Sequence, residues 1–200
     1  MSTQYRAIGA AGVLMLALFP GIATAALTQW RIEDGGNGHW YEAVFSGEIS
    51  WTDANGAATA AGGYLATITS EAENGFVYDL ARDKPLLWYV TLGGRTLGPW
   101  LGGYQSPDNH APNEDWHWVT GEPWGYTNWC AGEPNDYLGA NENRLQFFGY
   151  TPPQTSPQWS DSDGSASLYH LGYIVETPEP ATVSLLALGG LAAIWRRRAG

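Results

Sequence analysis

The chain of 200 residues has a single cysteine, Cys130, so it has no intramolecular disulfide. Charged residues make up only 14% of it, against about 25% in average soluble proteins, which argues against a helical bundle or a coiled coil. Basic residues are scarce, because 9 Lys and Arg stand against 20 Asp and Glu and leave a formal net charge of −11. So acidic a chain lacks the basic surface that phosphate binding requires, and we therefore expect no nucleic-acid partner.

Glycine, proline and tryptophan are abundant by contrast, with 26, 12 and 11 copies. Hydrophobic residues make up 44% of the chain and aromatic residues 14%, which is enough apolar surface to offset the entropy lost on folding. A chain of this length allows one ordinary domain with short appendages. The composition thus predicts one ordered domain with many turns.

The first 25 residues have the pattern of a secretory signal peptide. One early cation, Arg6, precedes an apolar stretch over residues 8–19, and residues 23–25 (ATA) form a small-x-small cleavage site. A membrane anchor is the alternative, but the apolar stretch is much shorter than the roughly 20 residues that a spanning helix needs. We therefore expect residues 1–25 to be a signal peptide that directs export and is removed.

The last 23 residues, 178–200, combine three features in a fixed order. Pro178-Glu179-Pro180 is followed by an apolar run, residues 181–195, and then by three arginines, residues 196–198. The arginines would keep this end cytoplasmic, and a helix of that length reaches only about 22 Å, too short for a comfortable permanent anchor. The order resembles the PEP-CTERM sorting signal of Gram-negative bacteria that secrete exopolysaccharide. The resemblance implies transient insertion into the inner membrane, recognition by a sorting protease of the exosortase type, and a mature domain at the cell surface or outside the cell.

Between the two signals, residues 26–177, the pattern predicts two helices and several strands. Residues 51–61 are rich in alanine and are followed by Gly62-Gly63, which is typical of a helix with a glycine stop. Ser70 and Glu73 have the spacing of a capping box, in which each side chain bonds the other residue's amide, and they predict a second helix to about Arg82. The predicted strands are residues 39–45, 64–68, 100–104, 116–119, 145–148, 158–161 and 169–176. Residues 108–143 hold too many turn formers for regular structure, and long loops of compact domains are usually functional or disordered.

Six motifs of this region occur in an order that resembles one known family. They are WTDANGAATAAGGYLATITSEAEN (51–74), PWLGGY (99–104), TNW (127–129), EPND (133–136), QWSD (158–161) and YIVE (173–176). Together they resemble the C-type lectin-like domain over nearly all of residues 26–177. The resemblance implies an α+β fold with two helices, short antiparallel strands, neighbouring termini and a long irregular loop region that can hold Ca²⁺ and sugar.

The family's conserved cystines are absent from this chain. Ala58 and Val175 stand where one cystine is expected, and contact between them would replace the cross-link by packing. Arg144 stands at a position of the other cystine, and we expect it to pair with an acid such as Asp163. Cys130 is expected to be a buried thiol or to form an intermolecular disulfide.

The resemblance also implies a set of metal ligands. Members that bind sugar surround one Ca²⁺ with a Glu-Pro-Asn loop, a later glutamate and an Asn-Asp pair, and these positions map onto Glu133, Asn135, Glu142 and Asp161. Pro134 is expected in the cis form, which turns the two flanking ligands inward. Ca²⁺ takes six to eight oxygens, so the main-chain oxygen of Asp161 and the vicinal hydroxyls of a sugar, or waters, would complete the shell.

Two departures from the family pattern leave alternatives open. Ser160 stands where sugar-binding members have asparagine, and a hydroxyl is a poorer oxygen ligand with no NH₂ to donate to a sugar. Asn141 precedes Glu142, so either residue fits the place of the later glutamate, and charge favours Glu142. An auxiliary calcium site is the alternative to simple solvation for Asp108, Glu114, Asp136 and Asn143.

The leading hypothesis is an exported, calcium-dependent carbohydrate-binding protein, in which Ca²⁺ bridges the acidic surface and a glycan such as extracellular polysaccharide. The ligand-binding residues would be Glu133, Asn135, Glu142, Ser160 and Asp161. The alternative is a structural or adhesion protein that uses the same fold without binding sugar, and the serine favours it.

We do not expect an enzyme. A glycosidase would need two of Glu142, Asp161 and Asp163 as acid and base, and in this fold neighbouring acids are better explained as metal ligands. The four histidines have no metal-ligand spacing and are expected to be structural or exposed. Four tryptophans lie inside structural motifs and are predicted to be core: Trp51, Trp100, Trp129 and Trp159. Three others could be core or sugar platforms: Trp116, Trp118 and Trp124.

Overall fold

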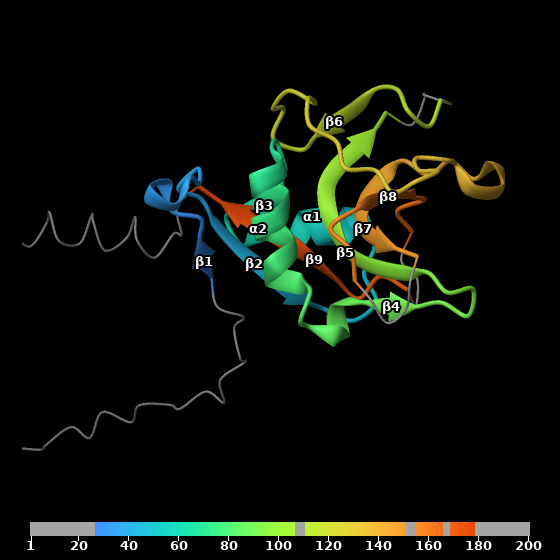
Figure 1. The fold of residues 1–200 in the computed structure, drawn as a ribbon, viewed down its shortest axis with the longest axis horizontal. Coiled ribbons are helices and arrows are strands. Elements are labelled where there is room, and N and C mark those ends of the chain that lie inside the picture. The colour runs from blue at the N-terminus through green and yellow to red at the C-terminus, as the bar shows by residue number, and fades with distance from the viewer. Residues whose placement is uncertain (1–26, 107–110, 151–154, 166–168, 179–200) are drawn as a thin grey trace, which may run out of the picture.

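The computed structural model describes residues 27–106, 111–150, 155–165 and 169–178 (Figure 1). The predicted signal peptide, nearly all of the sorting segment, Asp108 and His110 lie outside these ranges. The helices are α1 (Trp51–Ala60) and α2 (Glu71–Ala81), and short 3-10 turns are η1 (Ile32–Asp34), η2 (Pro85–Leu87) and η3 (Tyr137–Gly139). The strands are β1 (Thr28–Gln29), β2 (Trp40–Phe45), β3 (Tyr64–Leu65), β4 (Tyr89–Val90), β5 (Thr96–Gln105), β6 (Trp116–Trp118), β7 (Arg144–Gly149), β8 (Trp159–Ser162) and β9 (Gly172–Thr177). No helix of the described ranges has the length and apolar character needed to cross a membrane.

Both predicted helices are confirmed, within one residue of the expected ends. The hydroxyl of Ser50 caps α1 by accepting the amide of Asp53 at 3.0 Å. After α1 the chain turns at Gly62, whose φ of +86° is the left-handed conformation that glycine adopts readily. The local sequence is therefore sufficient to place α1.

The capping box of α2 forms only in part. Ser70 accepts the amide of Glu73 at 3.2 Å, as predicted. Glu73 accepts from the amide of Thr69 at 2.7 Å instead of that of Ser70. The reason is tertiary, because the other oxygen of Glu73 accepts the hydroxyl of Tyr41 at 2.7 Å in the core. The carboxylate thus joins α2 to β2 in addition to capping the helix.

The strands form one mixed sheet in the order β1-β2-β9-β5-β7-β8, with β3 added to β9 and both β4 and β6 added to β5. The named pairs are antiparallel except for the short parallel contact of β5 with β9. Thr28 pairs with Tyr41, and Trp40 pairs with Thr177, so the two ends of the described domain lie side by side. Neighbouring termini, which the family resemblance implied, are confirmed.

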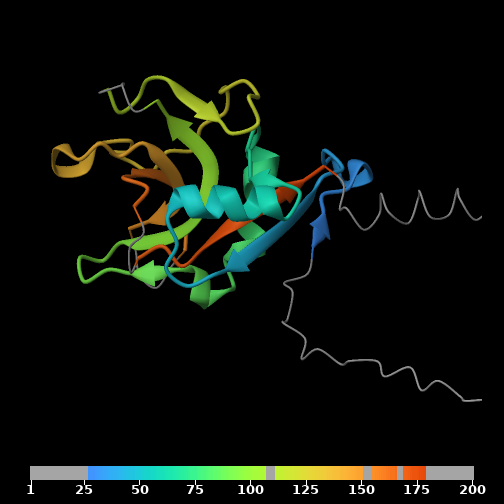
Figure 2. The same ribbon diagram turned by 180° about the vertical axis from the view of Figure 1, so that it is seen from behind.

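The two helices cover opposite faces of the central strand β9, as the views from both sides show (Figures 1 and 2). Ile174 packs in the core cluster that contains Val77 of α2, whereas Val175 packs in the second cluster with Ala58 of α1. Because both faces of β9 are buried, its residues 173–175 are all apolar instead of alternating with polar ones. Ala58 and Val175 share one cluster, so the predicted packing at the lost cystine is confirmed.

The tryptophans are mainly core residues. Trp100, Trp118 and Trp159 are fully buried, and Trp116 is 4% exposed. Trp124 is half-buried and lies with its ring centroid 4.5 Å from that of Trp118. The structure thus settles the open tryptophans in favour of packing. Trp51 is also buried, and the half-buried Trp129 packs against the core.

The predicted pairing of Arg144 with Asp163 is wrong. The Arg144 guanidinium lies over the ring of Trp51 at 4.7 Å and donates to the side-chain oxygen of Asn143 at 2.8 Å. Asp163 instead accepts the amide of Ser165 at 2.9 Å in a local turn. The arginine finds aromatic and carbonyl partners on its own side of the sheet, which removes the need for a carboxylate.

Cys130 is a buried thiol, which confirms one of its two expected states. Its sulfur contacts the side-chain oxygen of Gln158 at 3.4 Å. Burial raises the pKa of this thiol, so the side chain stays in the neutral form at physiological pH.

Candidate functional site

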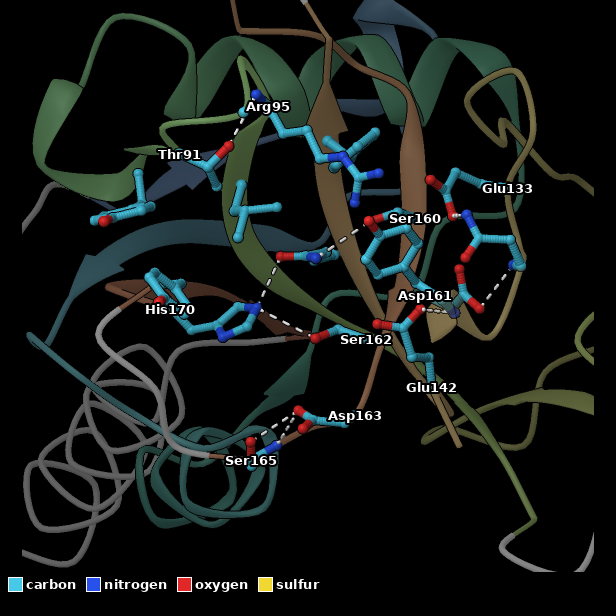
Figure 3. A pocket seen from close by; sticks show the side chains of 18 of the residues that line it. Thr91, Arg95, Glu133, Glu142, Ser160, Asp161, Ser162, Asp163, Ser165 and His170 are labelled. Atoms are coloured by element: carbon cyan, nitrogen blue, oxygen red, sulfur yellow. Dashed lines mark hydrogen bonds between the residues drawn. The ribbon is translucent and has the colours of Figure 1, made fainter. Parts of the chain in front are cut away.

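The predicted ligand residues come together at one side of the sheet. Glu133 and Asn135 lie on the long loop between β6 and β7, and Glu142 lies just before β7. Ser160 and Asp161 lie on β8, which pairs with β7. All five line a single groove of about 820 Å³ (Figure 3).

Asp161 fastens the long loop to β8. One oxygen of its carboxylate, Oδ2, accepts the backbone amides of both Asn135 and Asp136 at 2.9 Å. The peptide bond between Glu133 and Pro134 is cis, as expected. The side chains on either side of Pro134, those of Glu133 and Asn135, both line the groove.

Two oxygens in this cluster are buried without a hydrogen-bond partner among the described residues: Oδ1 of Asn135 and Oδ1 of Asp161. The side-chain nitrogen Nδ2 of Asn135 donates a hydrogen bond to Glu133 Oε2 at 2.7 Å. Of the two polar atoms of this carboxamide, only the nitrogen therefore has a partner among the described residues. A buried polar atom without a partner costs about 1–3 kcal/mol. An oxygen-ligated cation would satisfy both atoms, so the residues fit such a cation.

The electrostatics of the cluster also favour the binding of a cation. Burial, together with the neighbouring Asp161 and Glu142, raises the pKa of Glu133 to about 8. Burial and the nearby Asp161 raise the pKa of Glu142 to about 7, although the amide of Tyr137 acts in the opposite direction. Carboxylates held this close avoid repulsion by binding protons or a cation.

The expected metal ligands are not preassembled. No group of three acidic, histidine or cysteine side chains among the described residues is placed to hold a metal ion. Glu142 accepts the amide of Tyr137 at 2.7 Å, and Asp136 accepts the amide of Glu142 at 2.9 Å. Two of the residues predicted for an auxiliary calcium site do not support it. Asn143 accepts a hydrogen bond from Arg144, and Asp108 lies outside the described residues.

Ser160 belongs to a buried polar floor beneath the groove. Its hydroxyl accepts from Gln146 Nε2 at 3.2 Å, and Gln146 Oε1 lies 2.9 Å from Nε2 of His170. The His170 ring stacks on Trp100 with a centroid distance of 3.8 Å. His170 is therefore structural, as expected, although it also lines the groove.

The opposite wall of the groove was not predicted from the residue pattern. β5 begins at Thr96, before the predicted strand, and pairs with β4 to form a hairpin that carries Arg95. The guanidinium of Arg95 lies over the ring of Tyr137 at 4.3 Å. Two signals could have found this wall: the Gly93-Gly94 pair, which is typical of a hairpin turn, and an arginine in a chain with few basic residues.

Comparison with known proteins identifies two similarities, one in the C-terminal sorting segment and one in the domain that precedes it. The family model of the PEP-CTERM protein-sorting motif matches residues 176–198, which indicates export and a membrane-associated sorting signal. The C-type lectin lectoxin-Lio1 of Erythrolamprus poecilogyrus is 30% identical over 166 residues, which are 80% of this chain and 89% of that protein. Lithostathine of Rattus norvegicus is 29% identical over 106 residues, 53% of this chain and about half, 54%, of that protein.

Solved structures share the fold. The C-type lectin CEL-I from Cucumaria echinata superposes with a TM-score of 0.51 at 23% identity, over 69% of this chain and 89% of that one. The herring type II antifreeze protein superposes with a TM-score of 0.51 at 23% identity, over 72% and 93%. The predicted α+β fold is confirmed, and these matches also show that proteins with different names share it.

Proposed function

This chain belongs to the C-type lectin family and carries a PEP-CTERM sorting motif, and we propose that it is an exported protein that binds glycans through Ca²⁺. One observation carries the proposal: Asn135 and Asp161 each bury an oxygen that has no hydrogen-bond partner in the described part of the chain. The fold alone would not suffice, because the herring antifreeze protein shares it.

Each residue of the cluster would have its own role in binding the cation. Glu133 and Asp161 supply negative charge, and Asn135 supplies a neutral oxygen, while Glu142 lines the same groove and adds a further carboxylate. The second oxygen of Asp161 keeps the loop in place through the two backbone amides. When bound, Ca²⁺ would supply open coordination positions for two vicinal hydroxyls of a sugar, such as a unit of exopolysaccharide.

The second candidate is a structural or adhesion protein that does not bind sugar. The observation that favours it is Ser160, whose hydroxyl is bonded to Gln146 within the protein. A glycan array probed with Ca²⁺ and then with a chelator separates the two. Calcium-dependent binding supports the lectin, whereas absence of binding under both conditions supports the structural protein.

Ser160→Asn should tighten the binding of Ca²⁺ and of a mannose-type sugar. The carboxamide would add an oxygen for the metal and an NH₂ for the sugar, which together are worth about 1.5–3 kcal/mol, or roughly tenfold to a hundredfold in affinity. Calorimetry with Ca²⁺ and then with sugar measures both steps. Ser46→Asn is the matched control, since it adds the same group at an exposed position that is not part of the groove lining. Unchanged Ca²⁺ affinity in a folded Ser160→Asn protein would show that position 160 does not face the metal.

The sorting proposal divides the chain into a signal peptide (1–25), a mature domain (26–177) and a processed tail (178–200). Replacing Pro178-Glu179-Pro180 with three alanines should leave the apolar tail attached and the protein in the inner membrane, because the sorting protease would no longer recognise it. Fractionation and mass spectrometry of the C-terminus check this. An intact Arg198 on the exported wild-type protein would contradict the proposal.

A further inference from the structure

The groove extends well beyond the cluster that fits a cation. Its volume of about 820 Å³ lies in the upper part of the range of about 300–1,000 Å³ that is typical of small-molecule sites. A single sugar held by two hydroxyls at a cation would occupy only the end lined by Glu133, Asn135 and Asp161. The rest of the groove runs to the β4–β5 hairpin and to Tyr169, so it offers room for further units of a glycan chain.

Arg95 is a basic side chain in the part of the groove lining that lies outside the cluster of Glu133, Asn135 and Asp161. Its guanidinium lies over the ring of Tyr137 and, within the described residues, has no carboxylate within 4.0 Å and donates no side-chain hydrogen bond. Figure 3 shows it reaching across the groove toward the side where Glu133 and Ser160 lie. A guanidinium stacked on a ring keeps the N–H donors at its edge available, in a fork that matches a planar carboxylate.

Two tyrosines, Tyr89 and Tyr169, also line the groove. The rings of Tyr89 and Tyr169 lie 4.8 Å apart, and 43% of Tyr169 is exposed. Tyrosines combine an apolar face with a hydroxyl, which suits the C–H faces and hydroxyls of a sugar. The lining of the groove therefore combines a cluster that fits a cation, a guanidinium and a pair of tyrosine rings.

We propose that this groove binds a segment of acidic polysaccharide of at least two units, with the carboxylate of a uronic acid unit bonded to Arg95. The inference rests on the proposed function, because a neighbouring unit would sit at the Ca²⁺ end. Charge supports it: a bound Ca²⁺ and Arg95 together offset three of four lining carboxylates, Glu133, Glu142, Asp161 and Asp163. Without Ca²⁺ the neighbouring unit loses its coordination positions and the groove loses two positive charges, so acidic-glycan binding is calcium-dependent.

Calorimetry of the purified protein with matched sugars tests the inference. The probes are methyl α-mannoside, a β-linked mannuronate trimer and the methyl ester of that trimer, each titrated in Ca²⁺ and in chelator. The wild-type protein should bind the acidic trimer about tenfold to a hundredfold more tightly than the ester, because the ester removes the charge-assisted bond. Arg95→Gln should abolish this preference. Arg82→Gln, which removes an equal charge from an exposed residue paired with Asp79, should retain it.

The outcomes separate this inference from the function on which it rests. Binding of methyl α-mannoside with no preference for the acidic trimer would overturn the inference and leave the proposed function standing. A preference that survives Arg95→Gln would also overturn it. Failure of every probe to bind the wild-type protein in Ca²⁺ would reject both proposals together.

Discussion

Millimolar Ca²⁺ should raise the melting temperature of the wild-type protein, and the double variant Glu133→Gln with Asp161→Asn should lose the rise. A ligand that binds only the folded state stabilises it by about 2.7 kcal/mol at a concentration one hundred times its Kd. For a domain of this size that corresponds to about 5–10 °C. The substitutions keep the shape of both side chains and remove two of the charges that would hold the cation.

Thermal unfolding followed by fluorescence, in Ca²⁺, Mg²⁺ and chelator, measures this difference. Glu71→Gln with Asp79→Asn is the matched control, because it removes the same charge from the exposed surface of α2. The control should keep the Ca²⁺-dependent rise. A wild-type protein whose melting temperature is the same in Ca²⁺ and in chelator would refute the calcium mechanism.

His170 should make the domain less stable by about 3 kcal/mol as the pH falls from 6.5 to 4. Burial lowers the pKa of His170 from 6.5 to about 4, and the facing Asp163 raises it only in part. Between these values the unfolded chain binds a proton that the folded protein does not, so the stability present above pH 6.5 is lost on acidification. Each unit of pKa shift is worth about 1.4 kcal/mol.

Chemical denaturation of the wild type and of His170→Gln at pH 4 to 7.5 isolates this contribution. Subtracting the two curves removes the effect of Glu133 and Glu142, whose raised pKa values act in the opposite direction. His117→Gln is the control, because His117 is an exposed imidazole on β6. A difference between wild type and His170→Gln that stays constant with pH would contradict the assignment.

Local signals in the amino-acid sequence were sufficient for both helices and for seven of the strands in the described residues, but they did not predict β1 and β4. Ser50 and Ser70 cap helices through bonds that span three residues, and Gly62 turns the chain immediately after α1. For β9 the sequence pattern predicted a strand, whereas its burial on both faces is seen in the packed structure. The Glu-Pro-Asn loop and Asp161 were likewise recognisable, because their residue types and order are themselves the signal.

Contacts between distant segments were decided by the tertiary structure alone. Glu73 bonds Tyr41, 32 positions away, and Arg144 lies over Trp51 instead of pairing with Asp163. The groove wall that carries Arg95 faces a loop some forty residues later, which no short-range pattern encodes. The buried oxygens of Asn135 and Asp161 that lack a partner among the described residues also arise only where β8 packs against the loop that carries Asn135. Burial and hydrogen-bond satisfaction are properties of the packed chain, so residue order alone does not predict them.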